Sequence, residues 1–169
     1  PRRPSPTDPE RTGLTDPPGP PGEGGRQLTS KRVFDAPREL VWRAFTEAEQ
    51  FAQWFGHPPF QTPPSTVSMD VRPGGEWRAT QVNQDTGAEL PFAGSYREVS
   101  EPERLVMTFE NVEDRDDPKV EVVTVTFEDL GEKTEVTLNQ AGYMPPEQYK
   151  RTEQGYGAFF DQLEKLLAS

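Results

Sequence analysis

The sequence predicts an α+β domain in which a curved antiparallel sheet of about six or seven strands wraps around a long C-terminal helix. Apolar residues between positions 145 and 169 recur at steps of three and four, which is the period of a helix with one buried face. Between positions 67 and 139, apolar and polar residues instead alternate in short runs separated by turn residues. A strongly twisted sheet of this size curls, so a long helix can lie across its concave side.

The composition argues against several classes of protein. The 169 residues include no cysteine, which rules out a disulfide framework, a thiolate nucleophile and a cysteine-based metal site, and fits a cytoplasmic protein. No apolar run approaches the roughly 18 residues of a membrane span, and the first residues lack the apolar core of a signal peptide. The net charge of −11 argues against a nucleic-acid partner, which would require a positive surface.

Residues 1–25 are expected to form a disordered Pro/Gly-rich tail in front of a domain at residues 26–169. This segment holds eight of the nineteen prolines and five of the fourteen glycines, and its only large aliphatic residue is Leu14. Such a composition cannot bury enough apolar area to offset the entropy lost on ordering.

The first part of the domain predicts a strand followed by helix. Residues 27–34 have strand composition, and Asp35 and Pro37 then indicate a helix start, with Asp35 as an N-cap candidate and Pro37 in the first turn. Apolar residues follow at helical spacing as far as Phe55 and predict either one helix or, with a break near Thr46 and Glu47, two short helices. The proline-rich residues 56–64 predict a loop.

The middle of the chain predicts antiparallel strands joined by turns. The expected strands are residues 67–71, 76–82, 89–99, 104–110, 120–128 and 134–139. Pro91 indicates a sheet edge or a bulge in its strand, because proline cannot donate to the ladder. The acidic residues 113–117 lack the ligand spacing and central glycine of a calcium loop and predict a solvated hairpin loop.

The C-terminal segment predicts a helix that starts sharply at Pro145 and Pro146, where a missing N–H costs nothing. Gly155 and Gly157 are anomalous, since each lowers helix stability by about 1 kcal/mol relative to alanine. Gly155 borders the apolar stripe, so either a strand or a ligand approaches the backbone there, or the helix is kinked or simply tolerates the glycine.

The sequence indicates no catalytic set, metal or cofactor. His57 is the only histidine and lies in the proline-rich loop, where a packing or surface role is expected. Gly74 and Gly75 precede a strand and not a helix, so they do not form a phosphate cradle.

Strand alternation and helix spacing instead bring a set of aromatic and other large side chains to the inside of the sheet. The candidate ligand-binding residues are Trp77, Phe92, Tyr96, Met107, Phe109 and Phe127 on the strands and Tyr149, Tyr156 and Phe160 on the helix. These side chains either form the core alone, or some of them line a cavity for a small hydrophobic or aromatic ligand. A shift of strand phase by one residue near Gly75 or Pro91 would exchange the faces.

Several separate stretches, in order, resemble the START-like helix-grip superfamily (SRPBCC proteins), and within it the branch similar to the activator of the ninety-kilodalton heat-shock chaperone ATPase (AHSA-type domains). The matching stretches are FDAPRELVWRAFT (34–46), WFG (54–56), DVRPGGEW (70–77), FAGSY (92–96), PERLVMTF (102–109), VTVTFE (123–128) and GYGAFFDQL (155–163). The resemblance covers about residues 27–168. It implies the helix-grip fold, whereas the superfamily includes lipid carriers, cyclases, hormone receptors and co-chaperone domains.

One position departs from the family pattern. The family often has tryptophan after the first glycine of the last helix, and this chain has Tyr156. A buried tyrosine hydroxyl requires a hydrogen-bond partner or a ligand.

Three functions are compatible with these features. The first is binding of a small hydrophobic ligand without chemical change. The second is a chaperone-activator-like protein interaction through the outer sheet or the loop at residues 54–57, which the resemblance implies. The third is a cyclase- or dehydratase-type enzyme that uses a tyrosine such as Tyr96 or Tyr156, or a glutamate, as acid or base.

Overall fold

The computed structural model describes residues 26–110 and 120–168 and has the α+β architecture that the sequence predicts. The strands are β1 (Gln27–Phe34), β2 (Phe60–Gln61), β3 (Ser68–Met69), β4 (Glu76–Asn83), β5 (Glu89–Ser100), β6 (Arg104–Glu110), β7 (Val120–Asp129) and β8 (Thr134–Ala141). The helices are α1 (Arg38–Thr46), α2 (Ala48–Trp54), the short 3-10 helix η3 (Pro64–Thr66) and α3 (Pro146–Ala168). The expected tail at 1–25 and the expected acidic loop at 113–117 lie outside the described residues.

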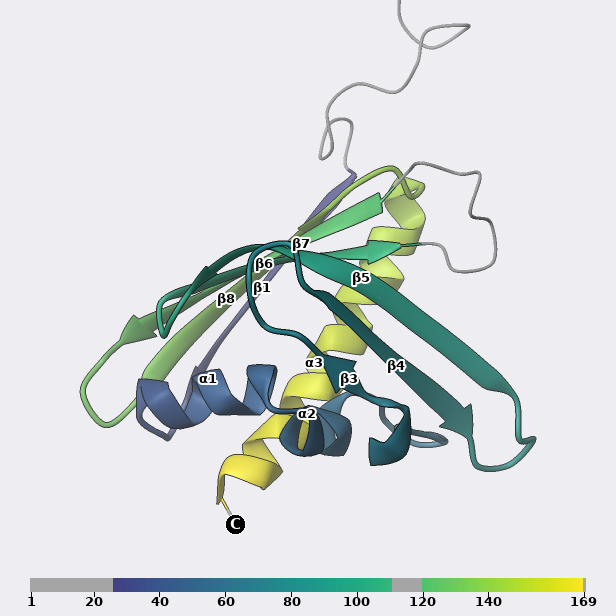
Figure 1. Ribbon diagram of the computed structural model, residues 1–169, viewed down its shortest axis with the longest axis horizontal. Coiled ribbons are helices and arrows are strands. Elements are labelled where there is room, and N and C mark those ends of the chain that lie inside the picture. Colours follow the sequence, from purple (N-terminus) through teal and green to yellow (C-terminus); the bar gives the residue numbers. More distant parts are fainter. Residues whose placement is uncertain (1–25, 111–119, 169) are drawn as a thin grey trace, which may run out of the picture.

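The strands form one eight-stranded antiparallel sheet in the order β1-β8-β7-β6-β5-β4-β2, with β3 also paired to β4. Strands β4 to β8 follow one another as a meander, and β1 returns beside β8. The sheet is curved, and α1, α2 and α3 all lie on its concave side (Figure 1). None of the helices in the described ranges is long and apolar enough to cross a membrane.

The helical region after β1 is divided at Glu47, as one of the two sequence interpretations expected. Glu47 has extended backbone angles, ends α1 and precedes α2. The expected N-cap is wrong, because Pro37 caps α1 without a side-chain hydrogen bond. The Pro37 carbonyl accepts the first helical N–H groups, from Leu40 and Val41, so the chain is still extended at Pro37 and Asp35 lies too early to cap the first turn.

Three local features of the sheet differ from the predictions. The proline-rich loop contains β2, whose Phe60 pairs with Asn83, although two residues are too few to show a period. Strand β3 is only two residues long where residues 67–71 were expected. The bulge in β5 lies between Tyr96 and Glu98 and not at Pro91, which was expected at a bulge or a sheet edge; Pro91 pairs with Thr80 of β4, and no described residue of β6 pairs with it.

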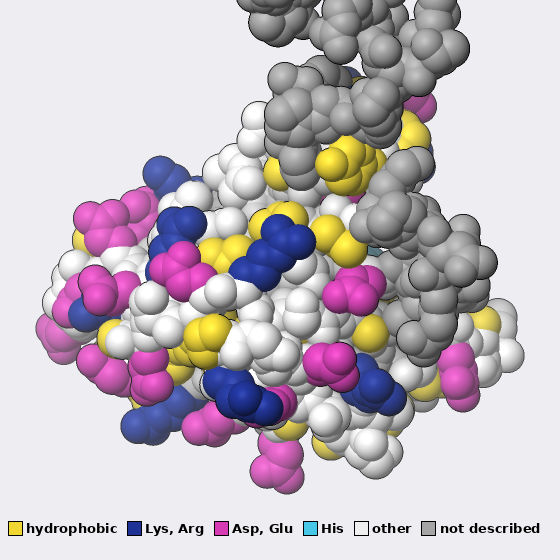
Figure 2. Space-filling view, turned by 45° about the horizontal axis from the view of Figure 1, so that its top comes forward, with side chains coloured by type: hydrophobic (Ala, Val, Ile, Leu, Met, Phe, Trp, Pro, Cys, Tyr) yellow, Lys and Arg dark blue, Asp and Glu magenta, His cyan; other side chains and the backbone are white. Residues whose placement is uncertain are grey.

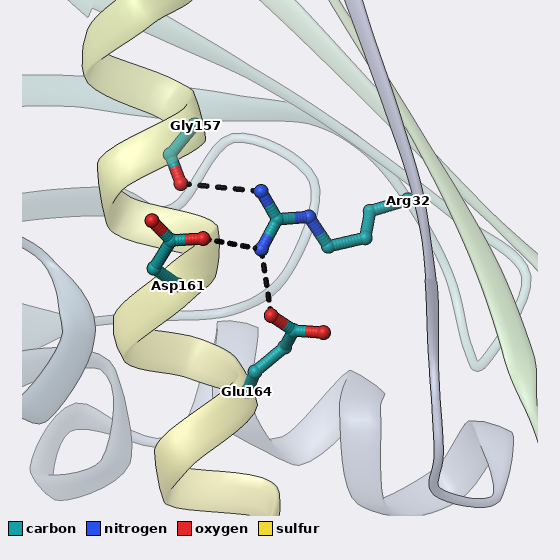
Figure 3. Close-up of polar contacts among 4 residues, drawn as sticks. All are labelled: Arg32, Gly157, Asp161 and Glu164. Atoms are coloured by element: carbon teal, nitrogen blue, oxygen red, sulfur yellow. Dashed lines mark hydrogen bonds and ion pairs between the residues drawn. The ribbon is translucent and has the colours of Figure 1, made fainter.

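Helix α3 is fixed to the sheet by apolar packing and by one arginine. The Phe160 ring is fully buried and meets Phe34 of β1 edge to face, with the ring centroids 5.5 Å apart. Arg32 of β1 contacts Asp161 at 2.8 Å and Glu164 at 2.9 Å, and donates to the Gly157 carbonyl at 3.3 Å (Figure 3). These contacts join the first strand of the domain to its last helix.

Candidate functional site

A cleft of about 710 Å³ separates the first half of α3 from the ends of β4 to β8. The volume is in the range of small-molecule sites, which extends from about 300 to 1,000 Å³. Its apolar walls come from Phe55, Leu90, Pro91, Phe92, Phe109, Val120, Met144 and Phe159, and its polar groups come from Gln81, Glu110, Glu121, Gln140, Tyr143, Gln148, Thr152 and Tyr156.

The ring of Phe55, directly after α2, lies at the centre of the apolar walls. Its centroid is 5.2 Å from that of Phe92, 5.4 Å from that of Phe159 and 6.4 Å from that of Phe109. Strands β5 and β6 and helix α3 therefore present aromatic surface to the same space as Phe55. From the sequence, Phe55 was expected in a helical pattern and in a loop that could contact a protein partner, and it was not among the candidate ligand-binding residues.

One face of α3 borders the cleft. Gln148, Thr152, Gly155 and Phe159 all line it, and their spacing of four, three and four residues places them in one row along the helix. A β-carbon added at Gly155 would meet no atom within 4 Å, so the expected approach of a strand to this backbone is wrong. The glycine instead leaves the cleft open where a side chain would enter it.

Replacement of Gly155 or Gly157 by alanine is expected to stabilise the protein by about 1 kcal/mol each, because alanine is the better helix former. A β-carbon has open space at both positions. Urea unfolding of the two variants would measure the gain, and a loss of stability in either variant would contradict the open space described here.

The floor of the cleft is a hydrogen-bonded chain formed by Tyr156, Gln140 and Glu121, which line the cleft, and by Tyr149, which belongs to the core. The Tyr156 hydroxyl donates to Gln140 Oε1 at 2.7 Å, and Gln140 Nε2 donates to Glu121 Oε1 at 3.1 Å. The Tyr149 hydroxyl also donates to Glu121 Oε1, at 2.7 Å, and the Tyr143 N–H donates to Glu121 Oε2 at 2.9 Å. The hydroxyl that distinguishes Tyr156 from the usual tryptophan therefore has a partner.

Burial raises the pKa of Tyr156, and the nearby Glu121 charge raises it further. Burial also raises the pKa of Tyr149, and its hydrogen bond to Glu121 acts in the same direction. Both phenols consequently stay protonated at neutral pH and act as hydrogen-bond donors. Neither is suited to act as a general base there.

Of the nine candidate residues, Phe92, Phe109 and Tyr156 line the cleft. The other six are buried in the core around it: Trp77, Tyr96, Met107, Phe127, Tyr149 and Phe160. Phe127, for example, packs against Trp42 and Phe45 of α1. The Tyr96 hydroxyl is buried and has no hydrogen-bond partner among the described residues, and burial raises its pKa.

Sequence reasoning missed Glu121 and Gln140, although alternation contains a signal for both. Glu121 shares the strand phase of Val123, Val125 and Phe127, which are buried. Gln140 shares that of Val136 and Leu138, which are also buried. A carboxylate and an amide in the inward phase of two neighbouring strands would have indicated a polar site inside the fold.

Residues 35–168 match the family described as Activator of Hsp90 ATPase homolog 1-like protein. The chain belongs to this family. The AHSA-type resemblance and the helix-grip fold expected from the sequence are both confirmed.

Solved structures support the fold. A protein from Chromobacterium violaceum is 26% identical with a TM-score of 0.74, and the match covers 85% of this chain and 98% of that one. A protein from Nitrosomonas europaea is 29% identical with a TM-score of 0.71, over 86% of this chain and 96% of that one. The AHSA1 protein from Silicibacter pomeroyi, at 21% identity and a TM-score of 0.71 over 84% and 97%, shows the fold alone. No curated protein matches the chain.

The other polar side chains described in this AHSA-type domain pack against neighbouring residues or lie on the surface. His57 Nδ1 lies 3.1 Å from the Pro58 carbonyl, and its ring packs 5.7 Å from that of Phe159. Within residues 26–110 and 120–168, no three histidine or acidic side chains gather as metal ligands. On the face shown in Figure 2, Lys and Arg side chains lie interspersed with Asp and Glu.

Proposed function

We propose that this AHSA-type protein binds a small, largely apolar or aromatic molecule in the cleft between the sheet and α3, without changing it chemically. The observation that carries the proposal is the cleft of about 710 Å³, with aromatic walls and a small set of ordered polar groups. Ligand sites typically combine these two features, since apolar walls supply affinity and a few fixed polar groups supply orientation.

The hydrogen bonds within the polar floor favour binding over catalysis, because they already use the protons of both phenols. The Tyr156 proton is directed to Gln140, and the Tyr149 proton to Glu121, so neither proton points to a bound molecule. A general acid has to present its proton to the reacting atom. The cyclase-type alternative therefore has less support than simple binding.

The activity in the family description belongs to the family's namesake, and a chaperone interaction stays a prediction for this chain. The loop at residues 54–57 offers little surface to such a partner, because Trp54 is 3% exposed and Phe55 is 4% exposed. The outer face of the sheet remains the surface available for it. The cytoplasmic location expected from the composition also stays a prediction.

The proposal is tested by amide NMR titration with a neutral aromatic probe, 2-naphthylmethanol. We expect shifts to cluster at Phe55, Phe92, Phe109 and Tyr156, and the Gly155→Leu variant to bind at least about tenfold more weakly, since its side chain enters the cleft. Gly157→Ala is the matched control, because it adds bulk to the same helix away from the cleft lining. Absence of shifts at the cleft residues with this probe would overturn the proposal.

A further inference from the structure

The hydrogen-bond directions in the cleft leave a surplus of acceptors. A carboxylate only accepts, so Glu121 orients the Gln140 amide with its nitrogen toward Glu121 and its oxygen toward Tyr156. The Tyr156 proton is thereby committed, and the Tyr149 proton is committed to Glu121 directly. What Tyr156 still offers to a ligand is the lone pairs of its oxygen.

Glu121 itself keeps one acceptor position. Its Oε1 receives hydrogen bonds from Gln140 and Tyr149, which use both lone pairs, whereas among the described residues the Tyr143 N–H is the one donor to Oε2. Glu121 lines the cleft, and the second lone pair of Oε2 is the position on its carboxylate that the described hydrogen bonds leave for a donor on a bound molecule.

The charge of the cleft also favours a donor on the ligand over an anionic group. Its described lining holds two carboxylates, Glu110 and Glu121, and no Lys, Arg or His. An anionic ligand would face these charges in partly apolar surroundings, where interactions are stronger than in water. The amides of Gln81 and Gln148 both donate and accept, so they accommodate a neutral polar group but do not favour an anion.

We infer that the molecule bound in this cleft is an apolar amine, with an aromatic or aliphatic body between Phe55, Phe92 and Phe159 and a protonated nitrogen beside Glu121 Oε2 and the Tyr156 oxygen. The inference rests on the proposed function and specifies its ligand class. It distinguishes this protein from a carrier of fatty acids, because the carboxylate of a fatty acid would lie against that of Glu121.

The test compares three probes with one ring system: 2-naphthylmethylamine, 2-naphthylmethanol and 2-naphthoate, titrated at pH 7 and followed by amide NMR and calorimetry. The amine is expected to bind at least about tenfold more tightly than the carboxylate, with the alcohol between them. This comparison uses the unaltered protein, so it does not depend on any variant folding.

Two variants locate the preference. Glu121→Gln removes the charge and is expected to reduce the ratio of amine to carboxylate affinity to within about threefold. Gly142→Ala keeps the charge but displaces it, because the added β-carbon would lie 2.0 Å from Glu121 Oε2. It is expected to reduce the ratio in the same way, whereas Gly157→Ala, which lies away from the cleft lining, should leave it unchanged.

The outcomes separate the two proposals. If the alcohol binds in the cleft but the three affinities are equal, or the carboxylate binds most tightly, the amine inference is wrong and the binding function stands. If the alcohol does not bind in the cleft, the proposed function itself is overturned. A preference for the amine that survives both Glu121→Gln and Gly142→Ala would overturn the role assigned to Glu121.

Discussion

Replacement of Gly94 by alanine is expected to lower the free energy of unfolding by at least about 3 kcal/mol, the upper range for overpacking a buried site. Gly94 lies in β5, opposite Trp77 of β4. The Trp77 indole crosses over this glycine and donates from Nε1 to the Thr108 carbonyl of β6, at 2.9 Å. A β-carbon at position 94 would lie 1.7 Å from that carbonyl oxygen and 2.7 Å from Nε1.

The clash involves backbone, so a rotamer change cannot relieve it. Either β6 moves away from β5 or the indole leaves its site, and both changes disturb a tryptophan that is 1% exposed. Urea unfolding of Gly94→Ala would measure the loss, with Gly157→Ala as a glycine-to-alanine control in open space. Trp77→Phe is a second comparison, because it removes the indole N–H but adds no atoms to β5.

The expected order is that Gly94→Ala costs more than Trp77→Phe, for which loss of the hydrogen bond and of ring volume predicts about 1–3 kcal/mol. A Gly94→Ala protein as stable as the original would show that the indole does not cross β5 as described. Because Trp77 was a candidate ligand residue, the same experiment tests its assignment to the core.

The parts of the fold that were predicted correctly are those with enough residues to show a period. Strand β1 has the bounds expected from composition, and α3 spans the segment in which apolar residues recur at helical spacing. Strand β2 was missed because a two-residue strand has no alternation, and its existence depends on pairing with β4. The contacts of Arg32 with Asp161 and Glu164 were likewise out of reach, since 129 and 132 residues separate the partners.

The candidate site was predictable only in part, for a related reason. Alternation assigns Phe92 and Trp77 to the inside of the sheet alike, but whether an inward residue lines the cleft or the core depends on where α3 stands away from the strands. The polar floor depends on register, because Glu121 reaches Gln140 only in the alignment that pairs Val123 with Gln140. A shift by one residue would have moved Glu121 to the outer face.

Raising the pH above 10 is expected to destabilise the protein by about 3 kcal/mol for each pH unit through Tyr96 and Tyr156 alone. Burial raises the pKa values of Tyr96 and Tyr156 well above the ordinary 10.0, while unfolding returns both phenols to that value. Above pH 10 the folded chain therefore holds protons that the unfolded chain has released, so stability falls as pH rises toward the folded pKa values. Each phenol contributes about 1.4 kcal/mol per unit, and Tyr149 acts in the same direction.

Urea unfolding at pH 8, 10 and 11, with absorbance of the native protein at 295 nm, would measure both the stability and the ionisation. Tyr156→Phe is the informative variant: it lacks the Gln140 hydrogen bond at every pH, but its stability should fall less steeply above pH 10, by about 1.4 kcal/mol per unit. The slope, and not the absolute stability, therefore reports the buried proton. An unchanged slope, or native phenols that all ionise near pH 10, would show that water reaches the Tyr156 hydroxyl. The assignment of its proton to Gln140 beneath the cleft would then be wrong.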